Sequence, residues 1–288
     1  MRTLRLGTRG SLLARTQSGH VAAAITQATG VAVELVIITT RGDRVTDRPL
    51  AEVGGKGLFT LELEEGLLDG SLDLAVHSMK DMPTDEPDGL VFGAIPVRQD
   101  PRDALVGGTL EELAEGGVIG TGSARRAAQL RKLRPDVRIA GIRGNVPTRI
   151  AKLEGESYDR VVLAAAGLAR LGLADRVGQY LDVEDMIPAV GQGALAVQCR
   201  ADDHELLGWL ARIHDERVAS EVAAERAFLR AVSGGCSVPA ACHVVIQDNR
   251  VTVWAAWERD GVLRRTRLEG LASEATSLAE AAAYGLGA

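Results

Sequence analysis

The sequence predicts an α/β fold, because strand-like and helix-like segments alternate along residues 1–96 and again along residues 100–190. Short runs rich in valine, isoleucine and leucine are separated by segments whose leucines recur at helical spacing. In addition, polar and basic residues follow directly after several of the predicted strands. Ligands of α/β sheets bind at the carboxyl ends of strands, so these strand-end segments are the predicted functional region.

The elements can be placed in order along the chain. Strands are expected at residues 3–7, 31–39, 72–77 and 90–95, with helices at residues 12–29 and 58–68. The second region predicts strands at residues 104–106, 118–120, 138–142 and 160–164, with helical stretches between them. A helix at residues 218–231 precedes strands at residues 243–247, 251–256 and 262–268, which are separated by the turn-forming pairs Asp248-Asn249 and Asp260-Gly261. The length of 288 residues fits two domains, or three small ones.

Composition argues against several classes of protein. A hydrophobic content of 46% is ordinary for a globular chain, and no apolar run approaches the roughly 20 residues of a membrane helix. The three cysteines lack CxxC spacing and the five histidines form no HExxH or Cys/His cluster, so neither a disulfide framework nor a metal site is expected. The first residues run straight into a strand without a signal-peptide pattern, which favours the cytoplasm.

The charge balance constrains the partners. The 33 basic residues are outnumbered by 39 acidic ones, which gives a net charge of −6, and aromatic residues make up only 3% of the chain. Nucleic-acid binding is therefore disfavoured, because it calls for a basic face and often for stacking rings. Any anion that this protein binds must be held by a local cluster of cations.

Two strand-end segments of the first region carry candidate binding residues. Arg9 and Ser11 precede a helix, where an arginine and free N–H groups can face an anion, although an N-cap beside a solvated arginine explains them equally well. Lys80 and Asp81 follow the strand at residues 72–77 and suit a site that handles both charges, with an idle ion pair on a solvated turn as the alternative. The glycine-rich run around Lys56 lacks the GxxxxGK[ST] pattern of a phosphate loop.

The second region repeats this arrangement with more arginines. The run from Gly120 to Arg126 approaches GxGxxG, but Arg125 stands where the third glycine would be, which indicates a helix N-terminus with hydroxyls and guanidiniums aimed at carboxylates. Asn145 can cap the next helix, with Pro147 and Arg149 in its first turn. Small residues also precede Arg170, so that a cation recurs near several strand ends.

A lone cysteine lies in Gly234-Gly235-Cys236-Ser237-Val238-Pro239. The glycines and the proline predict a loop after the helix at residues 218–231, where the Cys236 thiol could meet a ligand. The alternative is that Cys236 is a small buried hydrophobic residue. This segment alone leaves both readings open.

Taken together, eight motifs resemble the porphobilinogen deaminase (hydroxymethylbilane synthase) family in order and spacing. They are TRGDR…VGGKGLF, HSMKDMP, DPRDAL, GTGSARR, RGNVPTR, AAAGLARLGL, PAVGQGAL and GGCSVP. The match runs from about Arg5 to Pro239 and is very specific as a set, although no single motif is.

The resemblance implies two α/β lobes like those of two-lobed (type II) solute-binding proteins, plus a small α+β C-terminal domain. Residues 1–98 with 192–213 would form the first lobe, residues 99–191 the second, and residues 214–288 the third domain with the cysteine loop. A strand at residues 194–199 would return the chain to the first lobe.

It also implies an activity. Enzymes of this family are transferases of tetrapyrrole and haem biosynthesis that join four porphobilinogen molecules head to tail, losing ammonia each time, and then release linear hydroxymethylbilane by hydrolysis. They build the product on a dipyrromethane cofactor held by a thioether, here to Cys236. A monomer without nucleic-acid or membrane partners is expected.

The matched motifs assign roles residue by residue. Asp81 would be catalytic, stabilising the cation that forms when ammonia leaves. Cofactor binding would fall to Cys236, Ser78, Lys80, Thr121, Ser123, Arg125, Arg126, Arg143, Gly144 and Ala166. Substrate binding would fall to Arg9, Ser11, Gln17, Lys56, Phe59, Arg149, Arg170 and Gln192, with Phe59 equally explained as a helix core residue.

The main alternative is a non-enzymatic two-lobed protein that binds a small carboxylate. It would explain the cationic strand ends, but it gives Cys236 and Asp81 no purpose. Intact mass distinguishes the two functions, because only the enzyme should carry a dipyrromethane.

Overall fold

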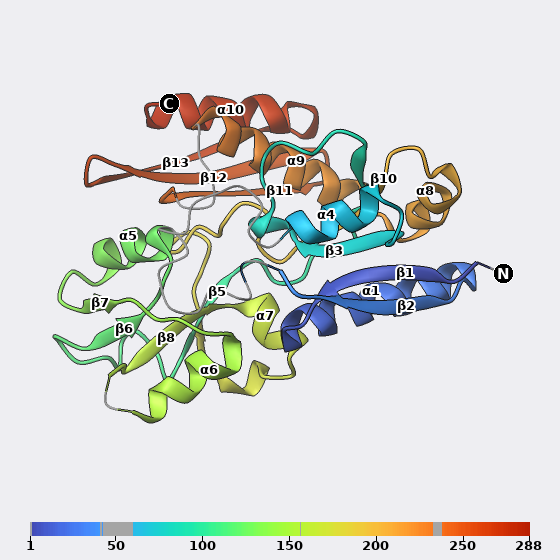
Figure 1. Cartoon of the computed structure of the whole chain (residues 1–288). Helices are drawn as coiled ribbons and strands as arrows, with labels where there is room; N and C mark the ends of the chain where they lie inside the picture. The colour runs from blue at the N-terminus through green and yellow to red at the C-terminus, as the bar shows by residue number, and fades with distance from the viewer. Residues whose placement is uncertain (1, 41, 43–59, 156, 233–237) are drawn as a thin grey trace. The chain divides into compact units, whose positions relative to one another are not determined.

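The structure, a computed structural model, describes residues 2–40, 42, 60–155, 157–232 and 238–288. The chain divides into two compact units, which comprise Met1–Arg98 with Ala194–Ala219 and Gln99–Gly193 with Ser220–Ala288. Each unit contains a five-stranded mixed sheet with helices, and the second unit adds a three-stranded sheet (Figure 1). The predicted α/β class is therefore confirmed.

The sheet of the first unit has the order β2-β1-β3-β10-β4. Its strands are β1 Leu4–Arg9, β2 Val33–Ile38, β3 Leu74–Ser78, β4 Leu90–Ala94 and β10 Leu195–Arg200. The three strands β2, β1 and β3 are parallel, whereas β10 runs antiparallel to both of its neighbours. One face packs on α1 (Leu12–Thr29) and α8 (His204–Leu210), and the other packs on α4 (Leu61–Leu68). The carboxyl ends of β1 and β3 consequently lie together at one edge of the sheet.

The five-stranded sheet of the second unit has the order β7-β6-β8-β5-β9. Its strands are β5 Asp103–Val106, β6 Val118–Gly120, β7 Arg138–Ala140, β8 Arg160–Ala164 and β9 Val177–Tyr180, and its helices are α5 Ala124–Leu133, α6 Val146–Ala151 and α7 Ala165–Arg170. Because β6 is parallel to β7 and β8, the loops that leave these three strands emerge at the same edge. Since β5 runs antiparallel to β8, its first residue lies at that edge too.

The three-stranded sheet consists of β11 (Ala240–Gln247), β12 (Arg250–Arg259) and β13 (Val262–Leu271). Helices α9 (Glu216–Ala231) and α10 (Ala275–Leu286) cover one face with alanines and with the fully buried Phe228. The predicted turns are confirmed, with φ of 47° at Asp248, 61° at Asn249 and 53° at Asp260.

Several predicted boundaries differ from the structure. Strand β1 extends to Arg9 because its register with β2 continues to the pair Arg9–Ile38, and β11 starts three residues early because Ala240 already pairs with Trp257. Strand β9 and helix α8 are absent from the prediction. The separation of residues 214–288 as a third domain stays a prediction.

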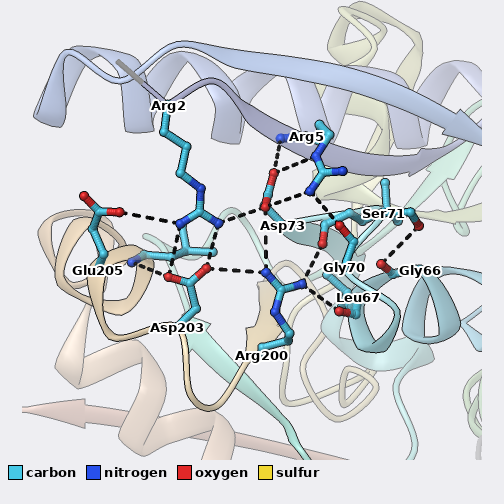
Figure 2. Close-up of polar contacts among 12 residues, drawn as sticks. Arg2, Arg5, Gly66, Leu67, Gly70, Ser71, Asp73, Arg200, Asp203 and Glu205 are labelled. Carbon is cyan, nitrogen blue, oxygen red and sulfur yellow. Dashed lines mark hydrogen bonds and ion pairs between the residues drawn. The ribbon is translucent and has the colours of Figure 1, made fainter.

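A network of charged side chains lies at the amino end of β1 (Figure 2). Asp73 accepts hydrogen bonds from Arg5 Nε at 3.1 Å and from Arg2 Nη2 at 2.8 Å, and its oxygen lies 3.7 Å from Arg200 Nη2. Asp203 binds Arg2 at 2.7 Å, and Glu205 lies 3.6 Å from the same guanidinium. Three arginines thus face three carboxylates, and the network joins β1, β3 and the segment after β10.

Candidate functional site

In the first unit, the predicted residues gather where β1 and β3 end. Arg9 is the last residue of β1, and Ser11 caps α1 by accepting a hydrogen bond from the backbone N–H of Ala14 at 3.2 Å. Gln17, one turn further along α1, donates to the hydroxyl of Ser78 at 3.1 Å. The parallel pairing of the two strands therefore brings predicted binding residues from distant parts of the sequence into contact.

Lys80 and Asp81 lie on a single 3₁₀ turn directly after β3. The turn, Met79–Asp81, is fixed because the Met79 N–H donates to the carbonyl of Ala194 at 3.1 Å, and because Met79 and Met82 are buried. Lys80 is half-buried and Asp81 is exposed. Buried apolar side chains on both sides of an exposed carboxylate hold it in place without masking it from a ligand.

The neighbouring His77 carries no positive charge near neutral pH. It is buried, and its Nε2 lies 3.0 Å from Oε1 of Gln198 on β10. Burial and, to a smaller extent, the nearby Arg9 lower the pKa of His77 to about 4, although the hydrogen bond to Gln198 opposes them. Among the predicted binding residues that the structure describes in this unit, the cationic side chains are therefore Arg9 and Lys80.

In the second unit, hydroxyl groups form the start of α5. Ser123 caps the helix by accepting from the N–H of Arg126 at 3.4 Å, and the Ser123 N–H donates to the Thr121 hydroxyl at 3.2 Å. Both residues follow β6, as the sequence predicted for a strand-end loop. The first turn of the helix then carries Arg125 and Arg126.

The two arginines of α5 are buried against a carboxylate of the protein. Arg125 is 5% exposed and Arg126 is 6% exposed, and both contact Asp103, the first residue of β5, which is fully buried. Burial alone would raise the pKa of Asp103, but the two guanidiniums lower it far below its ordinary value. The sequence pattern predicts guanidiniums aimed at carboxylates, but nothing in it points to Asp103 as their partner.

The loop between β7 and α6 carries Arg143, and α6 itself carries Arg149, so two further arginines lie after β7. Gly144 has a φ of 112°, which favours glycine, and its carbonyl accepts from Arg149 Nε at 2.7 Å. Burial lowers the pKa of Arg149, and the positive charges of Arg126 and Arg143 lower it further. Arg126 and Arg143 are thus both close enough to Arg149 to repel it.

Helix α7 and the segment before β10 complete this edge. Ala166 is buried in α7, and Arg170 at the end of the helix donates to the carbonyl of Gly193 at 2.7 Å. Burial lowers the pKa of Arg170 to about 10. Gln192 is buried and donates to Asp103 Oδ1 at 2.9 Å.

Three predicted residues, Lys56, Phe59 and Cys236, lie outside the described residues. The others fall into two groups, one at the carboxyl end of β1 and β3, the other at the edge where β6, β7 and β8 end. Among the residues that the structure describes, no group of three His, Cys, Asp or Glu side chains could hold a metal ion. None of the described helices has the length and apolarity to cross a membrane.

This arrangement suits a ligand with several carboxylates. Guanidinium groups bind carboxylates through two parallel hydrogen bonds, and the strand ends of the second unit supply more buried positive than negative charge. The acidic side chains of a dipyrromethane fit such an excess of positive charge.

Sequence comparisons identify similar proteins over most of the chain. Residues 4–208 match the family described as "Porphobilinogen deaminase, dipyromethane cofactor binding domain", and residues 219–286 match its C-terminal domain. Porphobilinogen deaminase of Syntrophobacter fumaroxidans is 50% identical over 88% of this chain and 83% of its own length, and that of Syntrophotalea carbinolica is 52% identical over 87% and 81%. Among solved structures, the methionine-binding protein MetQ has a TM-score of 0.47 at 14% identity, covering 78% of this chain and 94% of its own.

Proposed function

Because this chain belongs to the porphobilinogen deaminase family, we propose that it condenses four porphobilinogen molecules head to tail on a dipyrromethane primer and then hydrolyses the product to hydroxymethylbilane. The primer is attached through Cys236, supplies the free pyrrole carbon from which the chain grows, and retains the product between condensations. The protein acts as a monomeric transferase, a hydroxymethylbilane synthase, in the cytoplasm.

One observation carries the proposal, namely the crowding of cations at the strand ends of the second unit. Arg125, Arg126 and Arg170 are buried there, as is Asp103. Burial, followed by repulsion from Arg126 and Arg143, lowers the pKa of Arg149. A ligand with several carboxylates relieves that repulsion, and charge-assisted hydrogen bonds contribute about 1.5–3 kcal/mol each. Thr121 and Ser123 add hydroxyl donors at the same edge.

Asp81 supplies a negative charge where the reaction forms a positive one. When the C–N bond of the protonated aminomethyl group breaks, ammonia leaves with the bonding electron pair and porphobilinogen becomes an azafulvenium cation. The bound cofactor would supply the pyrrole α-carbon to which the new C–C bond forms, and that carbon would then release its proton. The Asp81 carboxylate stabilises the cation electrostatically and can accept a proton from a pyrrole nitrogen or carbon. Its exposure on a rigid turn leaves it available to a ligand.

The binding of acidic pyrroles is divided among the remaining residues. The cofactor is held by the backbone of Gly144 and by Lys80, Ser78, Arg125, Arg126, Arg143 and Ala166. The incoming porphobilinogen and the growing chain are bound by Arg9, Ser11, Gln17, Lys56, Phe59, Arg149, Arg170 and Gln192. A non-enzymatic carboxylate binder is not favoured, because it would need neither Asp81 nor Cys236.

Intact mass spectrometry of the freshly purified protein tests this proposal. We expect the chain to be heavier than its polypeptide by one dipyrromethane, and Cys236→Ala to lack both the added mass and turnover of porphobilinogen. Cys242→Ala is the matched control, since its thiol is buried, and it should retain the added mass. A wild-type protein without the added mass that still makes hydroxymethylbilane would overturn the proposal.

A further inference from the structure

Asp103 is a fully buried carboxylate to which the proposed function assigns no role. It is the first residue of β5 and pairs with Ala164 at the end of β8, so it lies at the edge of the sheet where the proposed binding residues are. Its Oδ1 accepts hydrogen bonds from Arg126 Nε at 3.0 Å, Arg126 Nη2 at 2.8 Å and Gln192 Nε2 at 2.9 Å. Its Oδ2 lies 2.8 Å from Arg125 Nη1.

Each arginine is also fixed from a second direction. Arg126 Nη1 donates to the carbonyl of Val162 at 3.0 Å, and Arg125 Nη1 donates to the carbonyl of Ile187 at 2.7 Å. A guanidinium is planar, so two acceptors on different sides determine both its position and its orientation. Among the residues that the structure describes, Asp103 is the one carboxylate that contacts both arginines.

The charges within this cluster do not balance. Among the described residues, Asp103 is the only carboxylate that contacts either guanidinium, so one buried positive charge is in excess. Burial lowers the pKa of Arg125 and Asp103 opposes that effect, so the carboxylate helps to keep the arginine charged. Arg126 uses three of its five N–H donors on Asp103 and Val162, and the other two have no acceptor among the described residues.

We infer that Asp103 is a positioning residue that orients Arg125 and Arg126 to receive a carboxylate of the dipyrromethane cofactor, while reducing their combined charge to one. This inference rests on the proposed function. Without Asp103, two adjacent buried guanidiniums would repel each other and lose their common anchor. Asp103 acts through the arginines and does not itself contact the ligand.

The test compares Asp103→Asn with the matched control Asp100→Asn. Asp100 lies three residues earlier and also binds an arginine, Arg102, at 2.7 Å, but both side chains are partly exposed. The proposed function gives neither of them a role in binding. Cofactor-free protein is incubated with porphobilinogen, and the fraction of chains with the added dipyrromethane is followed by intact mass. We expect Asp103→Asn to load at least about tenfold more slowly and Asp100→Asn to stay within about twofold of the wild type.

A double-mutant cycle separates positioning from a general effect on folding. If Asp103 acts through the two arginines, Asp103→Asn should slow loading by a smaller factor beside Arg126→Gln than in the wild type, because only its contact with Arg125 then remains. The inference would be overturned if the double variant were slowed by the product of the factors measured for the two single variants. It would also be overturned if Asp103→Asn loaded the cofactor at the wild-type rate. A loading defect that only follows the thermal midpoint of unfolding would overturn it as well.

A milder variant covers the case in which Asp103→Asn does not fold. Asp103→Glu keeps the buried negative charge but lengthens the side chain, so it displaces the contact that the two arginines share. It should slow loading about threefold in the wild-type background and by a smaller factor beside Arg126→Gln; unchanged loading in the wild-type background contradicts the inference. Absence of the added mass from the wild-type protein would instead refute the proposed function, and the inference with it.

Discussion

The protein contains two networks of arginines and carboxylates whose charge balance differs. At the amino end of β1, three arginines face Asp73, Asp203 and Glu205, and the arginine side chains are 21–43% exposed (Figure 2). At the strand ends of the second unit, Arg125 and Arg126 share the single carboxylate of Asp103, and all three are buried.

The difference separates a network that serves the fold from the proposed binding site. A balanced network satisfies its own charges and needs no ligand, whereas excess charge in a buried position is costly until an ion of opposite sign binds. Position agrees with this distinction, because ligands of α/β sheets bind at the carboxyl ends of strands and not at the amino ends. If this distinction is correct, substitutions in the β1 network should change the stability of the fold, whereas substitutions at the strand ends of the second unit should change ligand binding and activity.

The largest effect is expected at the exposed carboxylate of the first unit. Asp81→Asn should lower kcat by about 10²–10³-fold, the loss typical when one key electrostatic group is removed, with little change in stability. Steady-state kinetics and thermal unfolding of the same preparation check this. Asp88→Asn, another exposed carboxylate, is the control and should keep wild-type kcat. A loss of less than threefold in Asp81→Asn would show that Asp81 is a bystander.

In contrast, Asp73 should affect stability and not chemistry. Burial alone would raise its pKa, but hydrogen bonds from Arg5 and then Arg2 lower it to about 2, from 3.8. A carboxyl with a lowered pKa stabilises the fold above pH 3.8, and this contribution disappears as the pH falls through about 2. Wild type should therefore exceed Asp73→Asn by about 2 kcal/mol in free energy of unfolding at neutral pH, and by nearly nothing at pH 2.

Denaturant unfolding at several pH values measures that difference. The exposed Asp202→Asn serves as the control and should follow the wild type throughout. A pH-independent gap between wild type and Asp73→Asn would show that the effect is one of packing and not of charge.

Removing one arginine from each network should change stability differently. Arg5→Leu deprives Asp73 of two hydrogen bonds and should cost about 1–3 kcal/mol of stability while activity persists. Arg149→Leu removes a cation that Arg126 and Arg143 repel, so stability should stay within about 0.5 kcal/mol while binding of porphobilinogen weakens. Thermal unfolding and KM of both variants, measured side by side, give the comparison. Equal losses of stability would remove the proposed distinction between the networks.

The smallest effect is expected at the rim of the balanced network. Glu205 is 64% exposed and lies 3.6 Å from Arg2, so Glu205→Gln should cost less than about 1 kcal/mol. Because exposed ion pairs are screened by salt, the difference from wild type should vanish in 1 M NaCl. A larger loss that persists in high salt would mean that the network is more tightly coupled than its exposure indicates.

The sequence alone predicts where the candidate site lies, because strand-end loops follow from local patterns. Ser11 and Asn145 cap helices as their positions predict, and the arginines follow the strands that the periodicity indicates. The anchor at Asp103 could not be predicted in this way, because it lies 22 residues before Arg125 and meets it only after β5 pairs with β8. A carboxylate at the start of a short, fully buried strand was the one available signal.

The pairing of arginines with carboxylates at the amino end of β1 could not be predicted from the sequence either. Arg2 and Asp203 are 201 positions apart, and no local pattern connects them. They meet because β10 inserts between β3 and β4, which brings the segment after β10 to the amino end of the parallel strands. Local periodicity predicts elements, whereas the pairing of distant charges depends on sheet order.

The most direct test of the central claim compares cofactor content after one arginine of each network is replaced. Arg126→Gln and Arg200→Gln both remove a guanidinium that contacts a buried carboxylate. Intact mass of the purified variants should show that Arg126→Gln largely lacks the dipyrromethane and that Arg200→Gln carries it fully. Full occupancy in Arg126→Gln, or equal loss in both variants, would contradict the claim that the excess positive charge of the second unit exists to bind the cofactor.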